Sequence, residues 1–196
     1  MKTIRGKILT GFAIVLSILI GITFYNNIKL NSISSDVEDI TNKDMAFVES
    51  INSLSFSVVN RAKIARDYIL FKDATFKEEF LRETEKAIET EKMLFAAIEN
   101  GSISGELAIA IKEADEKTIQ WRKLVTEEII PLHDSGNRQA AINMMEERCL
   151  PYSKDAIDAW VKVVEIQNDI TKSKAENIVA SSSQAQLFII IASIAA

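Results

Sequence analysis

Residues 33–68 read ISSDVEDITNKDMAFVESINSLSFSVVNRAKIARDY, and this stretch determines how the chain folds. Apolar residues recur in it at alternating intervals of four and three, the spacing of a heptad seam between packed helices. The seam comprises Ile33, Val37, Ile40, Phe47, Ile51, Leu54, Val58, Ala65 and Tyr68. Two polar residues, Asp44 and Arg61, fall on the same seam. The pattern predicts one long helix, buried along one side, that carries two charged groups into its interface.

A second helix is expected after a turn at Lys72-Asp73-Ala74. Thr75 followed by Glu78 forms a capping box, which predicts that the helix begins there. Asn100-Gly101 should end it, because glycine readily adopts the left-handed conformation of a helix stop. Its expected buried side comprises Phe76, Phe80, Ala87, Leu94 and Ile98.

Third and fourth helices follow in the same way. Ser104 can cap the third helix, and Pro131 should kink or end it. The expected core stripe of this helix is Leu107, Ile111, Ala114, Thr118, Trp121 and Val125. Ser135-Gly136-Asn137 is the next break, after which the fourth helix runs to about Ala185. Its expected seam comprises Ile142, Met145, Cys149, Tyr152, Ala156, Ala159, Val163, Ile166 and Ile170.

The N-terminal residues 8–25 are apolar or small throughout and carry no charge. About 20 such residues cross the hydrocarbon core of a bilayer as a helix. Lys2, Arg5 and Lys7 precede this run, which predicts a cytoplasmic N-terminus. A cleaved signal peptide is the competing interpretation, although the run is long and no clean Ala-x-Ala site follows it. We expect a cytoplasmic segment 1–7 and a retained transmembrane helix 8–26.

The C-terminal residues 187–196, LFIIIASIAA, repeat this apolar character over about half the length of a span. We interpret residues 186–196 as the start of a second transmembrane helix; a short apolar tail is the alternative. Residues 27–185 would then form an extracytoplasmic domain. Because the first and fourth helices are long and the turns are short, the expected fold is all-α. It is a membrane-anchored, up-down-up-down four-helix bundle.

Composition and charge exclude several classes of function. The net charge of −5 makes the chain a poor partner for nucleic acid. Cys149 is the single cysteine and His133 the single histidine, so neither a disulfide nor a typical zinc site is expected. Phosphate-binding glycine loops and nucleophiles with a paired base are also missing from the sequence. We therefore expect no enzyme activity, cofactor or metal.

The sequence resembles the four-helix-bundle sensor domain of methyl-accepting chemotaxis proteins. Three stretches carry the resemblance: KTIRGKILTGF at residues 2–12, Asn60-Arg61-x4-Arg66-Asp67-Tyr68, and Gly136-Asn137-Arg138-Gln139-Ala140-Ala141. The resemblance implies a multi-pass receptor in the plasma membrane, continued by a cytoplasmic coiled coil that controls a kinase. It also implies a homodimer in which first-helix arginines of two subunits meet, a use that the spacing of Arg61 and Arg66 fits.

Counting residues at a uniform rise of 1.5 Å locates a candidate pocket. Arg61, Arg122 and Arg148 should lie at one level, with Trp121 and Tyr152 and the stretch from Thr84 to Thr90 nearby. Buried guanidinium groups need partners, and arginine binds carboxylates bidentately. We therefore expect a small carboxylate or amino acid as ligand, bound by Arg61, Arg66, Arg122, Tyr152, Trp121, Arg148, Thr84 and Thr90.

Structural roles for the same residues remain open. Arg61 could instead pair with Glu83, Glu91 or Glu147, or fix the helix register. Arg122 and Arg148 could face water, since long basic side chains often do. At the level of function, similar sensors occur on histidine kinases and cyclic-dinucleotide enzymes. A membrane-tethered adaptor that binds another protein, or sensing through a separate ligand-binding protein, is a further alternative.

Overall fold

The computed structural model describes residues 4–195, with side chains described for residues 4–187. Its elements, in chain order, are α1 (Ile4–Asp39), the π-helical turn η1 (Ile40–Asp44), α2 (Met45–Phe71), α3 (Ala74–Glu99), α4 (Gly105–Lys123), the π-helical turn η2 (Leu124–Ile129), α5 (Ile130–Asp134), α6 (Arg138–Met144), the π-helical turn η3 (Met145–Cys149) and α7 (Leu150–Ala195). They pack as two units. The bundle unit is Ala46–Asp169, and the paired-helix unit consists of the described residues of Met1–Met45 and Ile170–Ala196.

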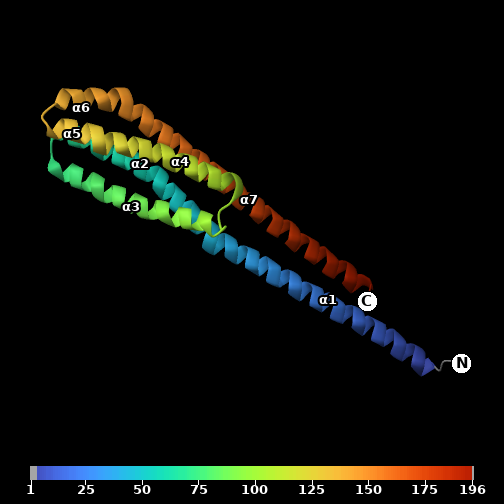
Figure 1. Cartoon of the computed structure of the whole chain (residues 1–196). Helices are drawn as coiled ribbons and strands as arrows, with labels where there is room; N and C mark the ends of the chain where they lie inside the picture. Colours follow the sequence, from blue (N-terminus) through green and yellow to red (C-terminus); the bar gives the residue numbers. More distant parts are fainter. Residues whose placement is uncertain (1–3, 196) are drawn as a thin grey trace. The chain divides into compact units, whose positions relative to one another are not determined.

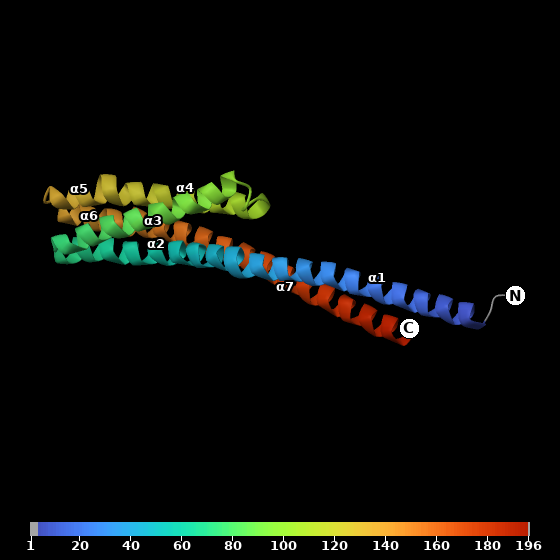
Figure 2. The same ribbon diagram turned by 90° about the horizontal axis from the view of Figure 1, so that it is seen from below.

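The bundle unit contains four antiparallel helical rods (Figures 1 and 2). The first rod is α2 and the second is α3. The third is α4 with η2 and α5, and the fourth is α6 with η3 and the first part of α7. Short turns join successive rods, and no strand occurs among residues 4–195. The predicted all-α, up-down-up-down four-helix bundle is confirmed.

Heptad seams build most of the bundle core as predicted, although Phe76 and Ile98 of α3 are only partly buried. Ile51, Leu54 and Val58 of α2 are at most 1% exposed, and each such side chain stabilises the fold by about 1.5–3 kcal/mol. Every residue of the stripe expected for the third rod is also buried: Leu107, Ile111, Ala114, Thr118, Trp121 and Val125. Arg61, the polar residue on the first seam, is likewise fully buried. The seam therefore carries a charged group into the centre of the bundle.

The start of α3 differs from the sequence prediction. Asp73, not Thr75, is the N-cap, and its carboxylate accepts hydrogen bonds from Thr75 N (2.9 Å) and Thr75 Oγ1 (2.8 Å). The extended backbone of Asp73 (φ −96°, ψ 118°) suits a cap, so the predicted capping box of Thr75 with Glu78 is wrong. Gly101, with φ +79°, follows the end of α3 as expected.

Both prolines of the chain lie two residues after a π-helical turn. Proline has no N–H, so Pro131 cannot donate to the carbonyl of Glu127, nor Pro151 to that of Glu147. Those carbonyls lie inside η2 and η3, where the hydrogen-bond ladder departs from α geometry. Pro131 therefore does not end the third rod, which continues through α5 to Asp134.

The turn η3 also changes the register of the fourth rod. After Cys149 the buried positions of the bundle unit are Ser153, Ala156, Ala159, Trp160, Val163 and Gln167, whereas Tyr152 is 37% exposed. The expected inward position of Tyr152 is wrong, because a π turn takes more residues per turn than an α-helix. Trp160, which the predicted seam omits, is fully buried, and its Nε1 donates to Thr118 Oγ1 at 2.9 Å.

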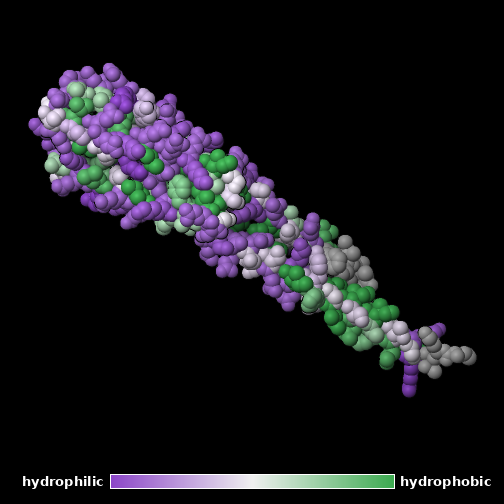
Figure 3. Space-filling view, viewed as in Figure 1, coloured by the Kyte–Doolittle hydropathy of each residue, from purple (hydrophilic) through white to green (hydrophobic). Residues whose placement is uncertain are grey.

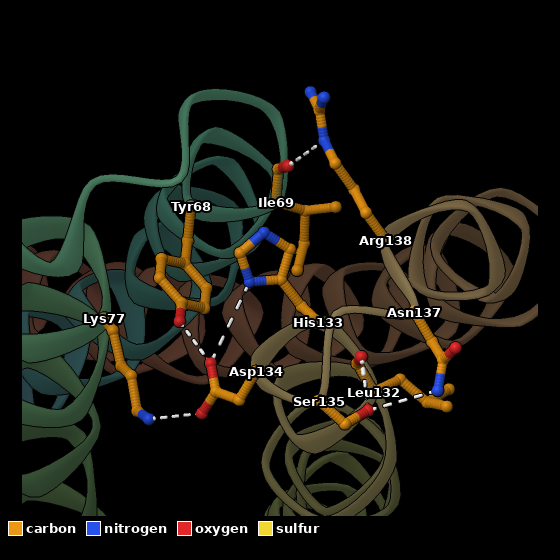
Figure 4. Close-up of polar contacts among 9 residues, drawn as sticks. All are labelled: Tyr68, Ile69, Lys77, Leu132, His133, Asp134, Ser135, Asn137 and Arg138. Carbon is orange, nitrogen blue, oxygen red and sulfur yellow. Dashed lines mark hydrogen bonds and ion pairs between the residues drawn. The ribbon is translucent and has the colours of Figure 1, made fainter.

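A cluster of polar contacts joins the rods at the turns after α2 and α5 (Figure 4). The Asp134 carboxylate accepts hydrogen bonds from the Tyr68 hydroxyl of α2 and from Lys77 Nζ of α3, the latter at 2.6 Å. Arg138 of α6 donates to the carbonyls of Ile69 (3.2 Å) and Leu70 (2.7 Å), which satisfies the end of α2. We call Tyr68, Lys77, Asp134 and Arg138 the turn cluster.

His133 lies beside the turn cluster and contributes mainly packing. Its ring meets that of Tyr68 edge-to-face at 4.6 Å between centroids. Neither ring nitrogen has a hydrogen-bond partner within the described part of the chain, and Nδ1 is 3.9 Å from Asp134 Oδ1.

The paired-helix unit combines a hydrophobic N-terminal stretch with an ion pair between a buried aspartate and a half-exposed lysine. The first part of α1 is apolar enough to cross a membrane, with a mean hydropathy of 2.3 over 18 residues and none of them buried. Figure 3 shows the corresponding hydrophobic surface. Farther along, the 6% exposed Asp44 of η1 accepts two hydrogen bonds from Lys174 Nζ of α7, at 2.7 and 2.9 Å. Both polar seam positions, Asp44 and Arg61, are thus buried.

We expect Tyr68→Phe to lower the free energy of unfolding by about 1.5 kcal/mol, because the hydroxyl donates to a charged carboxylate. Chemical denaturation of the full chain in detergent micelles measures this. Tyr152→Phe is the matched control; it alters an exposed tyrosine and should change stability by less than about 0.5 kcal/mol.

The effect of Tyr68→Phe should also depend on pH. Hydrogen bonds from Lys77 and Tyr68 hold the pKa of Asp134 below its ordinary value. The contribution of this carboxylate is therefore present above about pH 4 and is lost as the pH falls through its lowered pKa. An equal effect of the substitution at pH 7 and pH 2 would contradict this account of the cluster.

Candidate functional site

The most unusual group in the bundle unit is the guanidinium of Arg61 in α2. The residue is 0% exposed, and its Nε donates to the carbonyl of Ser57 at 3.3 Å. Nη1 and Nη2 are buried without a hydrogen-bond partner among residues 4–195. The guanidinium carbon lies 5.2 Å from the ring centroid of Trp121, a cation–π distance. Burial lowers the pKa of Arg61 to about 10, so the group remains charged near neutral pH.

The buried acid Glu91 of α3 pairs with Arg122 rather than with Arg61. Glu91 is 5% exposed, and its Oε2 lies 3.2 Å from Nη1 of Arg122 in α4. The other oxygen, Oε1, is buried with no hydrogen-bond partner in the described structure. The carboxylates of Glu91 and Glu83 favour the charged form of Arg61, whereas Arg122 opposes it. Glu83 itself pairs with Lys86 at 2.8 Å.

Two further polar groups complete the cluster. Thr84 of α3 is 7% exposed, and its Oγ1 has no hydrogen-bond partner among the residues that the structure describes. Asp115 of α4 is half-buried. Burial, and secondarily the charge of Glu91, raises the pKa of Asp115 to about 6, while Arg122 acts in the opposite direction. We call Arg61, Thr84, Glu91, Asp115 and Arg122 the polar core cluster.

Aromatic side chains form the apolar side of this region. Trp121 is fully buried and packs edge-to-face with Phe80 of α3, 6.1 Å between centroids. Cys149 lies nearby; burial raises the pKa of its thiol to about 11, which Trp121 partly opposes. Trp160 hydrogen-bonds Thr118, one turn before Arg122. The surroundings of Arg61 therefore exclude water and strengthen electrostatic interactions.

Arg66 lies on the surface of the bundle, apart from the polar core cluster. Its side chain is 54% exposed and its Nε is 3.7 Å from Asp67 Oδ1. It borders a half-open groove of about 170 Å³ between α2 and the fourth rod. Apolar side chains and one acid make up the rest of the groove: Ile69, Leu70, Ile142, Met145, Glu146 and Leu150.

Arg148 and Tyr152 also face outward. Arg148 forms a two-pronged ion pair with Glu128, at 2.5 and 3.3 Å, which raises the pKa of the guanidinium. This pair links η2 to η3 on the bundle surface. Thr90 is partly exposed, and its hydroxyl donates to the carbonyl of Lys86 at 3.2 Å.

The structure links three of the eight predicted ligand-binding residues, Arg61, Trp121 and Arg122, through a ring contact and nearby charges. Thr84 is buried on α3, one turn after Phe80. The structure places Arg66, Arg148, Tyr152 and Thr90 outside that group, and a ligand-binding role for any of the eight stays a prediction.

Sequence reasoning considered Glu91 as a partner of Arg61 but did not place Asp115 in the site. The signal for both acids was their position one turn from buried seam residues, Ala87 and Leu94 for Glu91 and Ile111 and Thr118 for Asp115.

Chemically, the polar core cluster offers unmatched hydrogen-bond donors and acceptors in a dry setting. Each buried polar atom without a partner costs about 1–3 kcal/mol. A small polar molecule that supplied the missing partners would recover part of that cost. Among residues 4–195, no three His, Cys, Asp or Glu side chains lie close enough together to hold a metal ion.

Comparison with known proteins gives one match. A family model described as a four helix bundle sensory module for signal transduction matches residues 1–182, which is most of the chain. No curated protein and no solved structure matches.

We expect Arg61→Met to raise the free energy of unfolding of the ligand-free chain by about 1–2 kcal/mol. The substitution removes a buried charge whose Nη atoms have no partner in the described structure, and methionine fills similar space with apolar atoms. Chemical denaturation of the full chain in micelles provides the measurement.

Lys63→Gln is the matched control, because Lys63 is a basic but exposed residue of the same helix and glutamine keeps its position polar. It should change stability by less than about 0.5 kcal/mol. A loss of 2 kcal/mol or more in Arg61→Met would instead assign Arg61 a stabilising structural role.

Proposed function

The chain belongs to the family of four-helix-bundle sensory modules for signal transduction, and we propose that it senses a small anionic ligand. In this proposal it is the sensor region of a transmembrane chemoreceptor of the methyl-accepting type. Family membership and the apolar stretch of α1 indicate membrane association. The bundle unit would lie outside the cell and the N-terminus in the cytoplasm, as the basic residues before the apolar stretch favour. A cytoplasmic kinase system would receive the signal.

The observation that carries the ligand proposal is the buried guanidinium of Arg61, whose Nη1 and Nη2 lack a partner among the described residues. Such a group is costly unless something binds it. A carboxylate matches its planar pair of donors bidentately. Arg122 adds a second positive charge close enough to lower the pKa of Arg61. The region is therefore best suited to a small molecule that carries a carboxylate.

Signal transmission requires that the ligand prefer one of two conformations of the bundle. Arg61 lies on a helix that continues without a break from Ile4 to Phe71, through η1. The helix α7 is likewise continuous from Leu150 to Ala195. A small displacement of α7 against α2 on ligand binding would therefore be carried along continuous helices toward both apolar segments.

An exposed apolar stripe along α2 supports a homodimer. Phe56, Val59 and Leu70 are 70%, 46% and 44% exposed, and they lie at helical spacing on the side opposite the buried seam. Large apolar side chains exposed in a row mark interaction surfaces. We propose that this stripe packs against the same stripe of a second copy.

Ligand binding is tested by a thermal-shift screen of the full chain in micelles against organic acids and amino acids. A ligand present at about a hundred times its dissociation constant should stabilise the chain by about 2.7 kcal/mol. Arg61→Met should abolish the shift, because it removes the group that binds the carboxylate.

Two further variants locate the site. Lys63→Gln, which alters an exposed basic residue of the same helix and keeps it polar, should leave the shift unchanged. Loss of the shift in Arg66→Met but not in Arg61→Met would move the site to the surface groove beside Arg66. No stabilising ligand at millimolar concentration would favour a protein partner instead.

Dimerisation and orientation are tested with one variant, Phe56→Cys. Two copies packed along α2 should form a disulfide-linked dimer under mild oxidation, and a membrane-impermeant maleimide should label the thiol in intact spheroplasts. The unsubstituted chain is the control, since Cys149 is buried and its thiol pKa is raised. Labelling that appears after lysis alone would reverse the proposed orientation.

A further inference from the structure

Two acidic side chains of the polar core cluster lie at nearly the same height on neighbouring helices. Glu91 precedes the end of α3 at Glu99 by eight residues, and Asp115 follows the start of α4 at Gly105 by ten. Because these helices are antiparallel and joined by a short turn, the two counts place the acids within about 3 Å of the same level. The charge of Glu91 accordingly acts on Asp115. Two carboxyl groups therefore share one partly buried site.

Glu91 has one acceptor in this site that no group uses. Its Oε2 lies 3.2 Å from Nη1 of Arg122, whereas its Oε1 is buried and has no hydrogen-bond partner among residues 4–195. An ionised Asp115 does not supply a partner, because a carboxylate only accepts hydrogen bonds. A protonated Asp115 carries an O–H group, which is the donor that Oε1 lacks. A single proton thus converts two repelling acids into a hydrogen-bonded pair.

The charges around Asp115 determine when it takes up that proton. Burial and the charge of Glu91 raise the pKa of its carboxyl to about 6, and Arg122 of the same helix acts in the opposite direction. The other titratable groups around the polar core cluster are Glu83 of α3, Arg61 of α2 and Cys149 of η3. Arg61 and Cys149, with pKa values of about 10 and 11, keep their charge states in mildly acidic solution.

Both tryptophans of the chain contribute to the packing of α4 just after Asp115. Thr118, one turn farther along, accepts a hydrogen bond from Nε1 of Trp160 in α7 at 2.9 Å. Trp121 is fully buried and packs edge-to-face against Phe80 of α3. Loosening of α3 from α4 at the level of Asp115 would therefore disturb the surroundings of both indole rings.

We propose that Asp115 and Glu91 form a proton-operated switch within the bundle unit. In mildly acidic solution Asp115 is protonated and donates to Oε1 of Glu91, which holds α4 against α3. At higher pH the proton passes to the solvent, the two carboxylates repel each other, and the helices loosen at this level. Acidity of the surrounding solution is then an input to the bundle in its own right. The switch requires no small molecule at Arg61, so it is independent of the proposed ligand.

The stability of the ligand-free full chain in micelles tests the switch. Because the pKa of Asp115 is raised on folding, the contribution of the protonated pair is complete below about pH 4 and is lost as the pH rises through about 6. Between pH 5 and pH 7 the unfolding equilibrium constant should rise by up to about tenfold relative to that of Asp115→Asn. Asparagine stays neutral and keeps an N–H donor for Glu91 at every pH.

Two comparisons isolate Asp115 in this measurement. The difference between the unsubstituted chain and Asp115→Asn cancels the effect of every group on which Asp115 does not act, His133 included. Glu116→Gln, which alters the exposed neighbour on α4, is the matched control and should keep the pH profile of the unsubstituted chain.

Acrylamide quenching of tryptophan fluorescence measures the packing separately from the stability. Acrylamide is uncharged, so its access to Trp121 and Trp160 depends on their exposure, which is 0% for both. Quenching of the unsubstituted chain should increase as the pH rises through about 6. Asp115→Asn should keep the low value up to pH 8. This difference would not arise if Asp115 lost its proton without any change in the packing of the helices.

Each outcome decides the inference. The same pH profile in Asp115→Asn and in the unsubstituted chain, in either measurement, would overturn the switch. A stability that rises between pH 5 and pH 7 relative to Asp115→Asn would also overturn it. Both measurements are made without ligand, so an unsuccessful ligand screen leaves the switch standing, and failure of the switch leaves the ligand proposal standing.

If Asp115→Asn does not fold, an NMR titration of the aspartate carboxyl carbons in the unsubstituted chain replaces it. One carboxyl signal with a midpoint near pH 6 supports the switch. Midpoints near or below about pH 4 for every aspartate, the ordinary range, would contradict it.

Discussion

A charged guanidinium inside an apolar helix bundle constrains everything packed around it. Arg61 occupies a seam position that would otherwise hold an aliphatic side chain, and it is completely buried. The fold tolerates it through the Ser57 carbonyl, the face of Trp121 and the nearby charge of Glu91. These contacts leave the Nη atoms without partners in the described structure. Apolar residues would serve a purely structural core better, and for that reason we propose a ligand-binding role for Arg61.

The two prolines explain how a regular heptad protein acquires local irregularity near this site. Each proline lacks the N–H that would continue the helical hydrogen-bond ladder, and a π turn ends two residues before it. The Arg148–Glu128 ion pair joins these two turns on the outside of the bundle. On the inside, Trp121 and Cys149 bring the same two rods together. A change in packing at Arg122 would therefore reach the beginning of α7 through neighbouring irregular turns.

The turn cluster differs from the polar core cluster because its polar groups have hydrogen-bond partners. Asp134 is satisfied by Tyr68 and Lys77, and Arg138 satisfies the carbonyl end of α2. These contacts join the four rods at their turns through polar groups that have hydrogen-bond partners. The polar core cluster, by contrast, keeps unmatched atoms in a dry interior.

The sequence by itself determined the helical class, the four rods and most of the core, because heptad spacing and glycine turns act over a few neighbouring residues. It also identified Arg61 as a buried charge, since that residue lies on an unmistakable seam. The tertiary structure decided which groups face Arg61, because partners on α3 and α4 are set by packing across the bundle. It also decided the register of the fourth rod after Cys149. In the sequence, spacings of four and three residues can follow one another in either order. The π turn before Pro151 places Ser153 inside the bundle and Tyr152 on its surface. Local sequence patterns predict which side of each helix is buried. Which of these sides pack together depends on how the helices meet.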